Sequence, residues 1–388
     1  MKIAFVSGIF FPQQGGVQVQ VHNFANKLIK LGHDIKLFLY NKTNIKNNNY
    51  DILIFNKLIL NIVFFFKYYL KIDLSIILKF YIISLIKKYR FDVWHFNFTT
   101  YKSLLLIDVL KNLKQKIIVT FHGADIQIDR SINYGYRIDS KYNKLLNNVI
   151  FKVDKFIYLS KTIKDDLLKI GIQENKLIYL PNCINLNKFN IQIKNIDNAE
   201  NIIKLLTVAR FAEKKKGYDN IEKILKLMIE KKIKFKWKII GENVSLLLKN
   251  NFINKNRNYF DIINTIENIE EEYFPHSKLI QHYQNSDLYV NLSRIESFGV
   301  TYIESLASKV PIISFVSKGS NELVIDNFNG FLIRDNNQSE LVDKICELSQ
   351  NKSIMKNMKK NCIDSVQKFD LDFNSIKLTE IYKKLKTI

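Results

Sequence analysis

The chain has 388 residues, of which 47% are hydrophobic and 25% are charged. This length and apolar content suffice for two α/β domains and exclude a disordered chain or a small disulfide-held scaffold. The three cysteines, Cys183, Cys346 and Cys362, lie far apart and are odd in number, which favours a reducing compartment. No Cys/His spacing suggests zinc, no signal peptide is expected before the first strand, and the longest apolar run, 58–66, is too short to cross a bilayer.

The net charge of +22 is distributed unevenly along the chain. Residues 1–190 contain 28 Lys and Arg against 12 Asp and Glu, a net charge of +16, whereas residues 191–388 contain 31 against 25, a net charge of +6. A basic first half predicts an anionic partner, which can be membrane lipid, a lipid-linked phosphate or nucleic acid. The Lys/Asn/Ile-rich composition accounts for part of this excess.

The first half begins with an apolar run, 2–7, that predicts a buried strand. A loop with Gly15 and Gly16 follows, and then an amphipathic helix that ends at Gly32. Such a strand, Gly-Gly loop and helix can hold a phosphate, but an ordinary tight turn has the same sequence. Further strands are predicted at 34–40, 51–55, 92–96, 116–121, 155–159 and 177–180.

The segment 57–90 is rich in Phe, Tyr, Ile and Lys and predicts two helices. In one interpretation the helices form an amphipathic patch on a membrane surface, with aromatic rings at the headgroup boundary and Lys67, Lys71, Lys79 and Lys87 towards anionic lipid. In the other, they are an apolar helix pair that covers the sheet. Periodicity does not distinguish the two interpretations.

The strand at 116–121 leads directly to His122 and Gly123, with Asp125 beyond. A single histidine after a strand is more often structural than catalytic, so the residue type alone assigns no role. The polar stretch 190–201 has no periodicity and predicts an interdomain linker.

The second half opens with a buried strand at 202–209, followed by Arg210 and then by Lys216 and Gly217. An arginine at a strand's carboxyl end, and a lysine before a glycine that opens a helix, stand where a diphosphate needs cations. Clustered lysines on a loop are more often only solvated. A strand at 237–240 ends in Gly241, and the polar segment 251–272 ends in three glutamates that are predicted to be solvated surface.

The stretch 289–314 predicts a strand, a polar loop, a helix and another strand. Glu296 is thereby placed in a loop at a strand's carboxyl end, and Glu304 about one turn inside the helix. The backbone amides of Phe298, Gly299 and Val300 lie at the helix N-terminus, which favours binding of a phosphate.

Two glutamates eight positions apart around a Phe-Gly, followed by Ala307 and Pro311, resemble the Glu-x7-Glu signature of the retaining glycosyltransferases of family 4. The resemblance covers nearly the whole chain and implies an α/β, GT-B fold, in which two Rossmann-like parallel-sheet domains face a central cleft. It implies an acceptor-side domain at 1–190, a nucleotide-sugar domain at 191–370, and a C-terminal helix at 371–388 that crosses back to the first domain. Lys309 stands where the family has glycine, which predicts a distorted turn or an extra charge.

The resemblance also implies roles for individual residues. His122 would line the donor-sugar pocket and assist the transferring centre, Glu296 would orient the sugar ring, and Glu304 would accept both ribose hydroxyls. Arg210 and Lys216 would hold the donor diphosphate as its negative charge grows. The remaining donor-binding residues that it implies are Gly15, Gly16, Gly241, Phe298, Gly299 and Val300.

The implied reaction is retaining transfer of a sugar from a nucleotide-diphosphate sugar to a saccharide acceptor, expected to be lipid-linked and to belong to surface polysaccharide or lipopolysaccharide biosynthesis. No cofactor and no metal are expected, because Asp370 and Asp372 lie between C-terminal helices and are interpreted as a helix N-cap. The expected location is cytoplasmic, at the inner face of the cytoplasmic membrane, without a nucleic-acid partner. Two alternatives remain: a nucleotide-sugar epimerase of the same fold, and a non-enzymatic basic protein that docks on a membrane.

Overall fold

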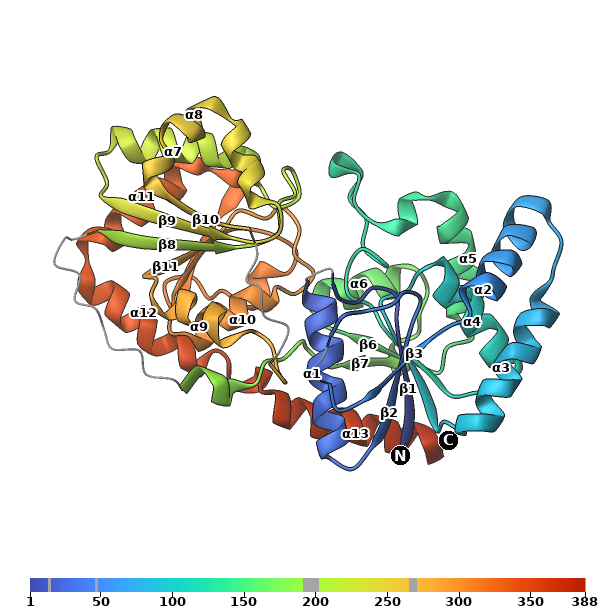
Figure 1. The fold of residues 1–388 in the computed structure, drawn as a ribbon. Helices are drawn as coiled ribbons and strands as arrows, with labels where there is room; N and C mark the ends of the chain where they lie inside the picture. Colours follow the sequence, from blue (N-terminus) through green and yellow to red (C-terminus); the bar gives the residue numbers. More distant parts are fainter. Residues whose placement is uncertain (13–14, 46–47, 191–201, 265–270, 388) are drawn as a thin grey trace. The chain divides into compact units, whose positions relative to one another are not determined.

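The computed structural model describes residues 1–12, 15–45, 48–190, 202–264 and 271–387 (Figure 1). Apart from the undescribed residues, the chain forms two compact units. Unit 1 contains Met1–Asn182, Ile269–Tyr273 and Leu371–Ile388, and unit 2 contains Cys183–Asn268 and Phe274–Asp370. The first division thus falls at Asn182, where the sequence suggested residue 190, and the predicted linker lies outside the described residues beyond its first position.

Unit 1 is built on a parallel sheet of seven strands in the order β3-β2-β1-β4-β5-β6-β7. Its strands are β1 (Lys2–Ser7), β2 (Asp34–Leu39), β3 (Asp51–Ile54), β4 (Val93–Asn97), β5 (Ile117–Thr120), β6 (Lys155–Tyr158) and β7 (Leu177–Tyr179). The central strands β4 and β5 are buried throughout and are mostly apolar, with His95, Asn97 and Thr120 as their polar residues. The strand order reverses between β1 and β4, the position at which open α/β sheets bind ligands.

Helices pack around this sheet, and the last of them returns to it from the far end of the chain (Figure 1). They are α1 (Gly16–Lys30), α4 (Tyr101–Asn112), α5 (Ser140–Ile150), α6 (Lys161–Lys169) and α13 (Leu371–Thr387). The hydroxyl of Tyr382 on α13 lies 2.6 Å from Nδ1 of His95 on β4, and Asp372 pairs with Lys27 of α1 at 2.7 Å. Asp370 directly precedes α13 with extended backbone, in the predicted N-cap position.

The segment 57–90 forms α2 (Lys57–Phe65), a π-helical turn (Phe66–Leu70) and α3 (Ser75–Tyr89). Leu60 and Val63 of α2, with Leu78 and Ile82 of α3, are buried in the core of unit 1. The helix pair therefore covers the core, as one of the two sequence interpretations expected, but its outer side remains exposed. Among the described residues, no helix has both the length and the hydropathy that crossing a bilayer requires.

Unit 2 is built on a parallel sheet of six strands in the order β10-β9-β8-β11-β12-β13. Its strands are β8 (Ile203–Val208), β9 (Phe235–Ile240), β10 (Phe260–Ile263), β11 (Leu288–Asn291), β12 (Ile312–Phe315) and β13 (Gly330–Ile333). Its helices are α7 (Ile221–Glu230), α8 (Asn251–Lys255), α9 (Ser277–Gln284), α10 (Val300–Ala307), α11 (Gln338–Gln350) and α12 (Lys352–Asp364). The order reverses between β8 and β11, which repeats the topology of unit 1.

The polar segment 251–272 contains a strand and a set of long-range contacts that the sequence did not indicate. Part of it forms β10, an edge strand in which Phe260 is buried while the next three residues are only partly buried, so its apolar signal is weak. Glu272 is not simply solvated, because its backbone oxygen accepts a hydrogen bond from Asn26 Nδ2 at 2.7 Å and its carboxylate pairs with Lys30 at 2.8 Å. These partners are more than 240 residues away in sequence, so no local pattern indicates them.

The turn after α10 keeps the shape that a glycine would give it. Lys309 adopts a left-handed conformation with φ of 61° and its side chain is exposed. Of the two outcomes predicted for this position, the structure shows the extra surface charge. The left-handed backbone conformation costs a residue with a side chain about 1 to 2 kcal/mol.

Candidate active site

Two loops of unit 2 meet at the carboxyl ends of β8 and β11, where the strand order reverses. The backbone amide of Arg294 donates to the Lys215 carbonyl at 3.0 Å, and the Arg294 guanidinium binds both oxygens of Asp219 at 2.7 and 2.8 Å. Gly217 has φ of +69°, and an added Cβ would lie 2.0 Å from the carbonyl oxygen of Leu292. The first loop therefore needs glycine at this point to approach the second.

The centre of the cluster is an ion pair between Lys216 and Glu296, which the sequence had placed in one site. The Lys216 Nζ lies 2.5 Å from Glu296 Oε1, and the two side chains are only 16% and 13% exposed. Burial alone would raise the pKa of Glu296, but the charge and hydrogen bond of Lys216, with the charge of Lys215, hold this pKa below its usual value. Glu296 is therefore ionised at neutral pH.

Lys215 and Arg210 add further positive charge to the cluster. Burial, together with the charges of Lys216 and Arg210, lowers the pKa of Lys215 to about 7, against the opposite influence of Glu296. Arg210 is exposed and forms no hydrogen bond or ion pair within the described part of the chain. Lys216, Arg210 and a partly protonated Lys215 beside one carboxylate leave an excess of positive charge, which a bound anion would neutralise. Sequence reasoning missed Lys215, because nothing local separates it from its two lysine neighbours.

Glu304 lies on α10, whose N-terminus is set by Gly299 in the left-handed conformation with φ of 95°. The Tyr283 hydroxyl donates to Glu304 Oε2 at 3.0 Å. Burial raises the pKa of Glu304 to about 8, although Tyr283 and the charge of Lys188 oppose the rise. The carboxyl group is thus mostly protonated at neutral pH. Tyr283 lies on α9 at no spacing that links it to Glu304, so the sequence did not identify it.

The two glutamates belong to one electrostatic environment. Burial raises the pKa of Tyr289 on β11, and the charges of Glu296 and Glu304 both add to this rise.

Gly241 lies at the end of β9, where an added Cβ would be 2.1 Å from the Ala209 carbonyl oxygen. Gly241 therefore packs against the residue that precedes Arg210.

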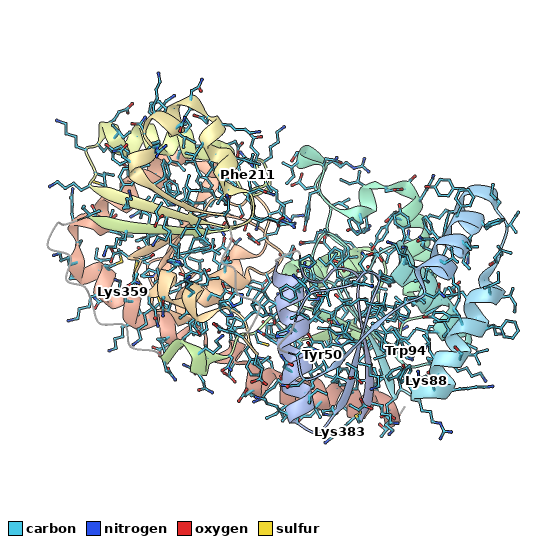
Figure 2. The ribbon with its side chains drawn as sticks, viewed as in Figure 1. Tyr50, Lys88, Trp94, Phe211, Lys359 and Lys383 are labelled. Atoms are coloured by element: carbon cyan, nitrogen blue, oxygen red, sulfur yellow. The ribbon has the colours of Figure 1, made fainter. Side chains whose placement is uncertain are left out.

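Phe211 supports the same loop and is labelled in Figure 2. Its ring stacks on that of Tyr218 with centroids 5.2 Å apart, and the Tyr218 hydroxyl donates to the Ala209 carbonyl at 2.6 Å. The predicted site residues of unit 2 thus lie at the carboxyl ends of β8, β9 and β11 and at the start of α10.

Unit 1 presents a different group of residues at the carboxyl edge of its own sheet. His122 follows β5, and burial lowers its pKa to about 3, so the ring is neutral. Its Nε2 is buried and has no hydrogen-bond partner among the described residues. The amides of His122 and Gly123 donate to Asp125 at 3.0 and 2.9 Å, and burial raises the pKa of Asp125 to about 7. Gly15 and Gly16 lie at the start of α1, after β1.

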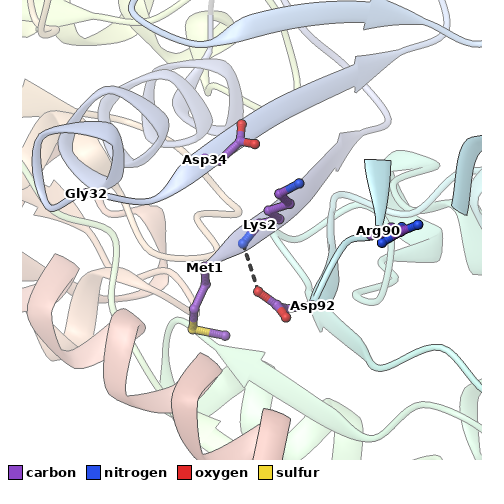
Figure 3. Close-up of a pocket in the computed structure, with 6 residues that line it drawn as sticks. All are labelled: Met1, Lys2, Gly32, Asp34, Arg90 and Asp92. Carbon is purple, nitrogen blue, oxygen red and sulfur yellow. Dashed lines mark hydrogen bonds between the residues drawn. The ribbon is translucent and has the colours of Figure 1, made fainter. Parts of the chain in front are cut away.

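A surface pocket of about 390 Å³ lies at the opposite, amino edge of the unit 1 sheet (Figure 3). Its lining consists of Met1, Lys2, Gly32, Asp34, Arg90 and Asp92. The Lys2 amide donates to Asp92 there at 2.9 Å, and none of the predicted site residues takes part. Among the described residues, no group of three or more His, Cys, Asp or Glu could hold a metal ion.

Two Rossmann-like parallel sheets in one chain, with a C-terminal helix returning to the first, define an α/β protein of the GT-B fold. A crystal structure of a glycosyltransferase from Rickettsia africae shares this fold with a TM-score of 0.75 and 22% identity, covering 99% of this chain and 98% of that one. A second, Anabaena HepE in complex with UDP-glucose, has a TM-score of 0.76 at 16% identity and covers 99% and 100%.

Two family models match consecutive parts of the chain. The model "Glycosyltransferase Family 4" matches residues 14–188, and "Glycosyl transferases group 1" matches residues 188–365. A glycosyltransferase of Methanocaldococcus jannaschii is 26% identical over 99% of both chains. The alpha-monoglucosyldiacylglycerol synthase of Streptococcus pneumoniae is 24% identical over 86% of this chain and 75% of its own length. The two models together match residues 14–365, which supports a glycosyltransferase of the GT-B fold.

Proposed function

We propose that this glycosyltransferase moves a sugar from a nucleotide-diphosphate sugar to a saccharide acceptor, with retention at the anomeric carbon. The observation that carries the proposal is the Lys216–Glu296 pair, set beside Arg210 and Lys215 where the strand order of unit 2 reverses. This cluster supplies cations for a diphosphate and an ionised carboxylate for sugar hydroxyls. The UDP-glucose bound to Anabaena HepE, a protein of the same fold, supports a nucleotide sugar as donor.

Sugar transfer separates charge in the transition state, and the cluster would lower the free energy of that charge separation. As the bond from the anomeric carbon to the diphosphate oxygen breaks, negative charge grows on the diphosphate and positive charge on the sugar ring. Arg210 and Lys216 would stabilise the leaving diphosphate, as would the amides of 298–300. The acceptor oxygen then bonds to the same face of the anomeric carbon, and a departing phosphate oxygen takes the acceptor's proton. This route needs no covalent intermediate on the protein and would preserve the configuration.

The remaining site residues would position the donor. Glu296 would orient the sugar ring through its hydroxyls, and Glu304 would bind the ribose, with the Tyr283 hydroxyl holding its carboxyl group. Glycines at positions 15, 16 and 241 would let the backbone approach the donor. His122, neutral and with an unpaired Nε2, would bind a sugar hydroxyl without adding charge beside the positive ring. Because lysine and arginine neutralise the diphosphate, the proposed reaction needs neither metal nor cofactor.

The acceptor is proposed to be a lipid-linked saccharide at the inner face of the cytoplasmic membrane, in the assembly of a surface polysaccharide or lipopolysaccharide. The basic first half of the chain supports an anionic acceptor or surface. The named activity of the Streptococcus pneumoniae relative, a synthase of a glucosyl diacylglycerol, supports a membrane-bound acceptor.

The direct test is incubation of the protein with a panel of nucleotide sugars and a membrane lipid extract, with products identified by mass spectrometry and their anomeric configuration by NMR. We expect a glycosylated lipid with the donor's configuration, in the presence of EDTA as well as without it, and none from the Glu296→Gln variant. A converted sugar nucleotide formed from donor alone would instead identify an epimerase. Membrane binding without affinity for any sugar nucleotide would identify a non-enzymatic docking protein.

A further inference from the structure

The side of the α2–α3 pair that faces away from the core of unit 1 is unusually apolar. Nine of the 21 large hydrophobic side chains that are exposed among the described residues lie between positions 58 and 80. We call this surface the outer apolar face, and Leu58, Ile62, Phe65, Tyr69, Ile76 and Phe80 define it. Leu58 and Phe80 are 68% and 67% exposed. A helix pair that packs on a core by one side usually has polar residues on its other side, so apolar side chains there need another explanation.

Residue spacing shows that these side chains form a second stripe rather than scattered exceptions. Leu58, Ile62, Phe65 and Tyr69 follow one another at steps of four, three and four, which places them on one face of the helical segment. The buried residues Leu60 and Val63 occupy the other face, so α2 is apolar on both sides. In α3, likewise, Ile76 and Phe80 lie on the exposed side, and Leu78 and Ile82 lie on the buried side. A soluble helix needs only one such stripe to pack on its core.

The outer apolar face is bordered by basic side chains. The segment 57–90 contains seven Lys and Arg and one acidic residue, Asp73. Lys71 and Lys79 are exposed and form no ion pair within the described part of the chain. The Phe65 ring stacks on Tyr69 with centroids 5.5 Å apart, and Lys141 lies 4.9 Å from the Tyr69 ring. Aromatic rings with lysines at their margin match the boundary between lipid headgroups and acyl chains.

Charge also decides between a membrane and a second copy of the chain. In a symmetric dimer through this face, the same basic residues of two copies would face one another and repel. An anionic lipid surface instead attracts each lysine and accepts the apolar side chains between them.

We propose that the outer apolar face is a membrane-docking surface, which inserts its aromatic and aliphatic side chains into the headgroup region of an anionic bilayer. Figure 1 shows α2 and α3 on the flank of unit 1, with α4 inward of them, so the face projects from the fold. The inference rests on unit 1 alone and holds whether or not unit 2 transfers a sugar.

The test is cosedimentation of the full chain with phosphatidylcholine vesicles prepared with and without phosphatidylglycerol. We expect binding that increases with the anionic lipid. Phe65→Ser and Phe80→Ser should weaken binding to both vesicle types, by about tenfold each, because each removes an inserted ring. Lys71→Gln and Lys79→Gln should weaken binding only to anionic vesicles, by about fivefold each. All four side chains are at the surface, so circular dichroism should show an unchanged fold.

Matched controls come from exposed residues elsewhere. Phe151→Ser removes a ring that is 55% exposed in the same unit, and Lys223→Gln with Lys234→Gln removes two exposed cations of unit 2. Both should bind vesicles like the parent protein. Equal losses in the controls, unchanged binding of the Phe65→Ser/Phe80→Ser double variant, or an effect of that variant on oligomeric state instead of vesicle binding would each overturn the proposal.

Discussion

Units 1 and 2 have the same scaffold but differ in the charge at the corresponding edge of their sheets. In unit 2 the loops after β8 and β11 carry Arg210, Lys215, Lys216 and an ionised Glu296. In unit 1 the loops after β1, β4 and β5, at 8–15, 98–100 and 121–129, contain no lysine or arginine at all. The His122 ring is neutral there, and the Asp125 carboxylate accepts hydrogen bonds from backbone amides. The comparison shows that the topology provides a place for a ligand, whereas the loop residues decide which charge it can carry.

The positive charge of the first half is therefore placed differently from that of the second. It lies on helices and outer surfaces, where Figure 2 shows Lys88 pointing outward while Trp94 is enclosed in the fold. Lysines of unit 2 that enter the cluster are partly buried and directed at one site. The overall net charge is thus the sum of two contributions, one spread over exposed helices and one gathered in the charged cluster of unit 2, and only the folded positions separate them.

The largest effect should come from breaking the charged cluster of unit 2. Lys216→Ala removes the cation paired with Glu296, and we expect kcat/KM for the nucleotide sugar to fall by about 10² to 10⁴, because a cation at a growing charge acts mainly in the transition state. Lys214→Ala is the control, since it removes an exposed lysine of the same loop and should change kcat/KM by less than about threefold. Similar losses in both variants would mean that the loop supplies only diffuse charge.

A second, smaller effect should appear as a pH dependence that is particular to unit 2. Lys215 has its pKa lowered to about 7 in the empty protein, and a bound diphosphate would raise it. Binding of UDP would then take up a proton at Lys215 above pH 7, so the contribution of Lys215 to affinity should fall by up to about tenfold per pH unit on the alkaline side. Glu304 works in the opposite sense, because its pKa of about 8 means that binding through the carboxylate releases a proton below that pH.

Calorimetric titration of UDP in two buffers with different ionisation enthalpies separates these contributions. Between about pH 7 and 8 the contributions of Lys215 and Glu304 offset each other, so the parent protein should lose affinity only above about pH 8. Lys215→Arg keeps the charge at all accessible pH values, so this loss should disappear. Lys214→Arg should leave that loss unchanged. A pH profile of Lys215→Arg that matches the parent protein would show that Lys215 does not titrate on binding.

Most of the fold follows from apolar runs that the sequence displays openly. The strands of unit 1 were each predicted within one residue, and β8 and β9 of unit 2 within two, because strands of a parallel sheet are mostly apolar. The edge strand β10 was not, since Phe260 is its one buried residue. The segment 57–90 left two interpretations open because its helices are apolar on both sides, and only burial separates the inner stripe from the outer.

For the candidate site, the sequence indicated which residues lie together better than it indicated their burial, pKa values and hydrogen-bond partners. Glu296 and Lys216 were assigned to one site by motif, and the structure places them in contact. The lowered pKa of Lys215 and the Tyr283 hydrogen bond to Glu304 depend on burial and on contacts between distant segments. No spacing rule encodes these, which is why they emerged only from the folded chain.

The smallest effect concerns the backbone of unit 2 and should leave unit 1 unchanged. Lys309 adopts a left-handed conformation that glycine takes without strain, so Lys309→Gly should raise the free energy of unfolding of unit 2 by up to about 1 kcal/mol, after allowance for glycine's greater freedom in the unfolded chain. Lys309→Ala keeps the Cβ and removes only an exposed charge, so it should change stability by less than about 0.5 kcal/mol.

The two tryptophans report on the units separately, because Trp94 is buried in unit 1 and Trp237 in unit 2. Denaturation followed by fluorescence in a Trp94→Phe background measures unit 2, and a Trp237→Phe background measures unit 1. A gain in both units, or an equal gain from Lys309→Ala, would show that charge rather than backbone strain limits stability at this turn.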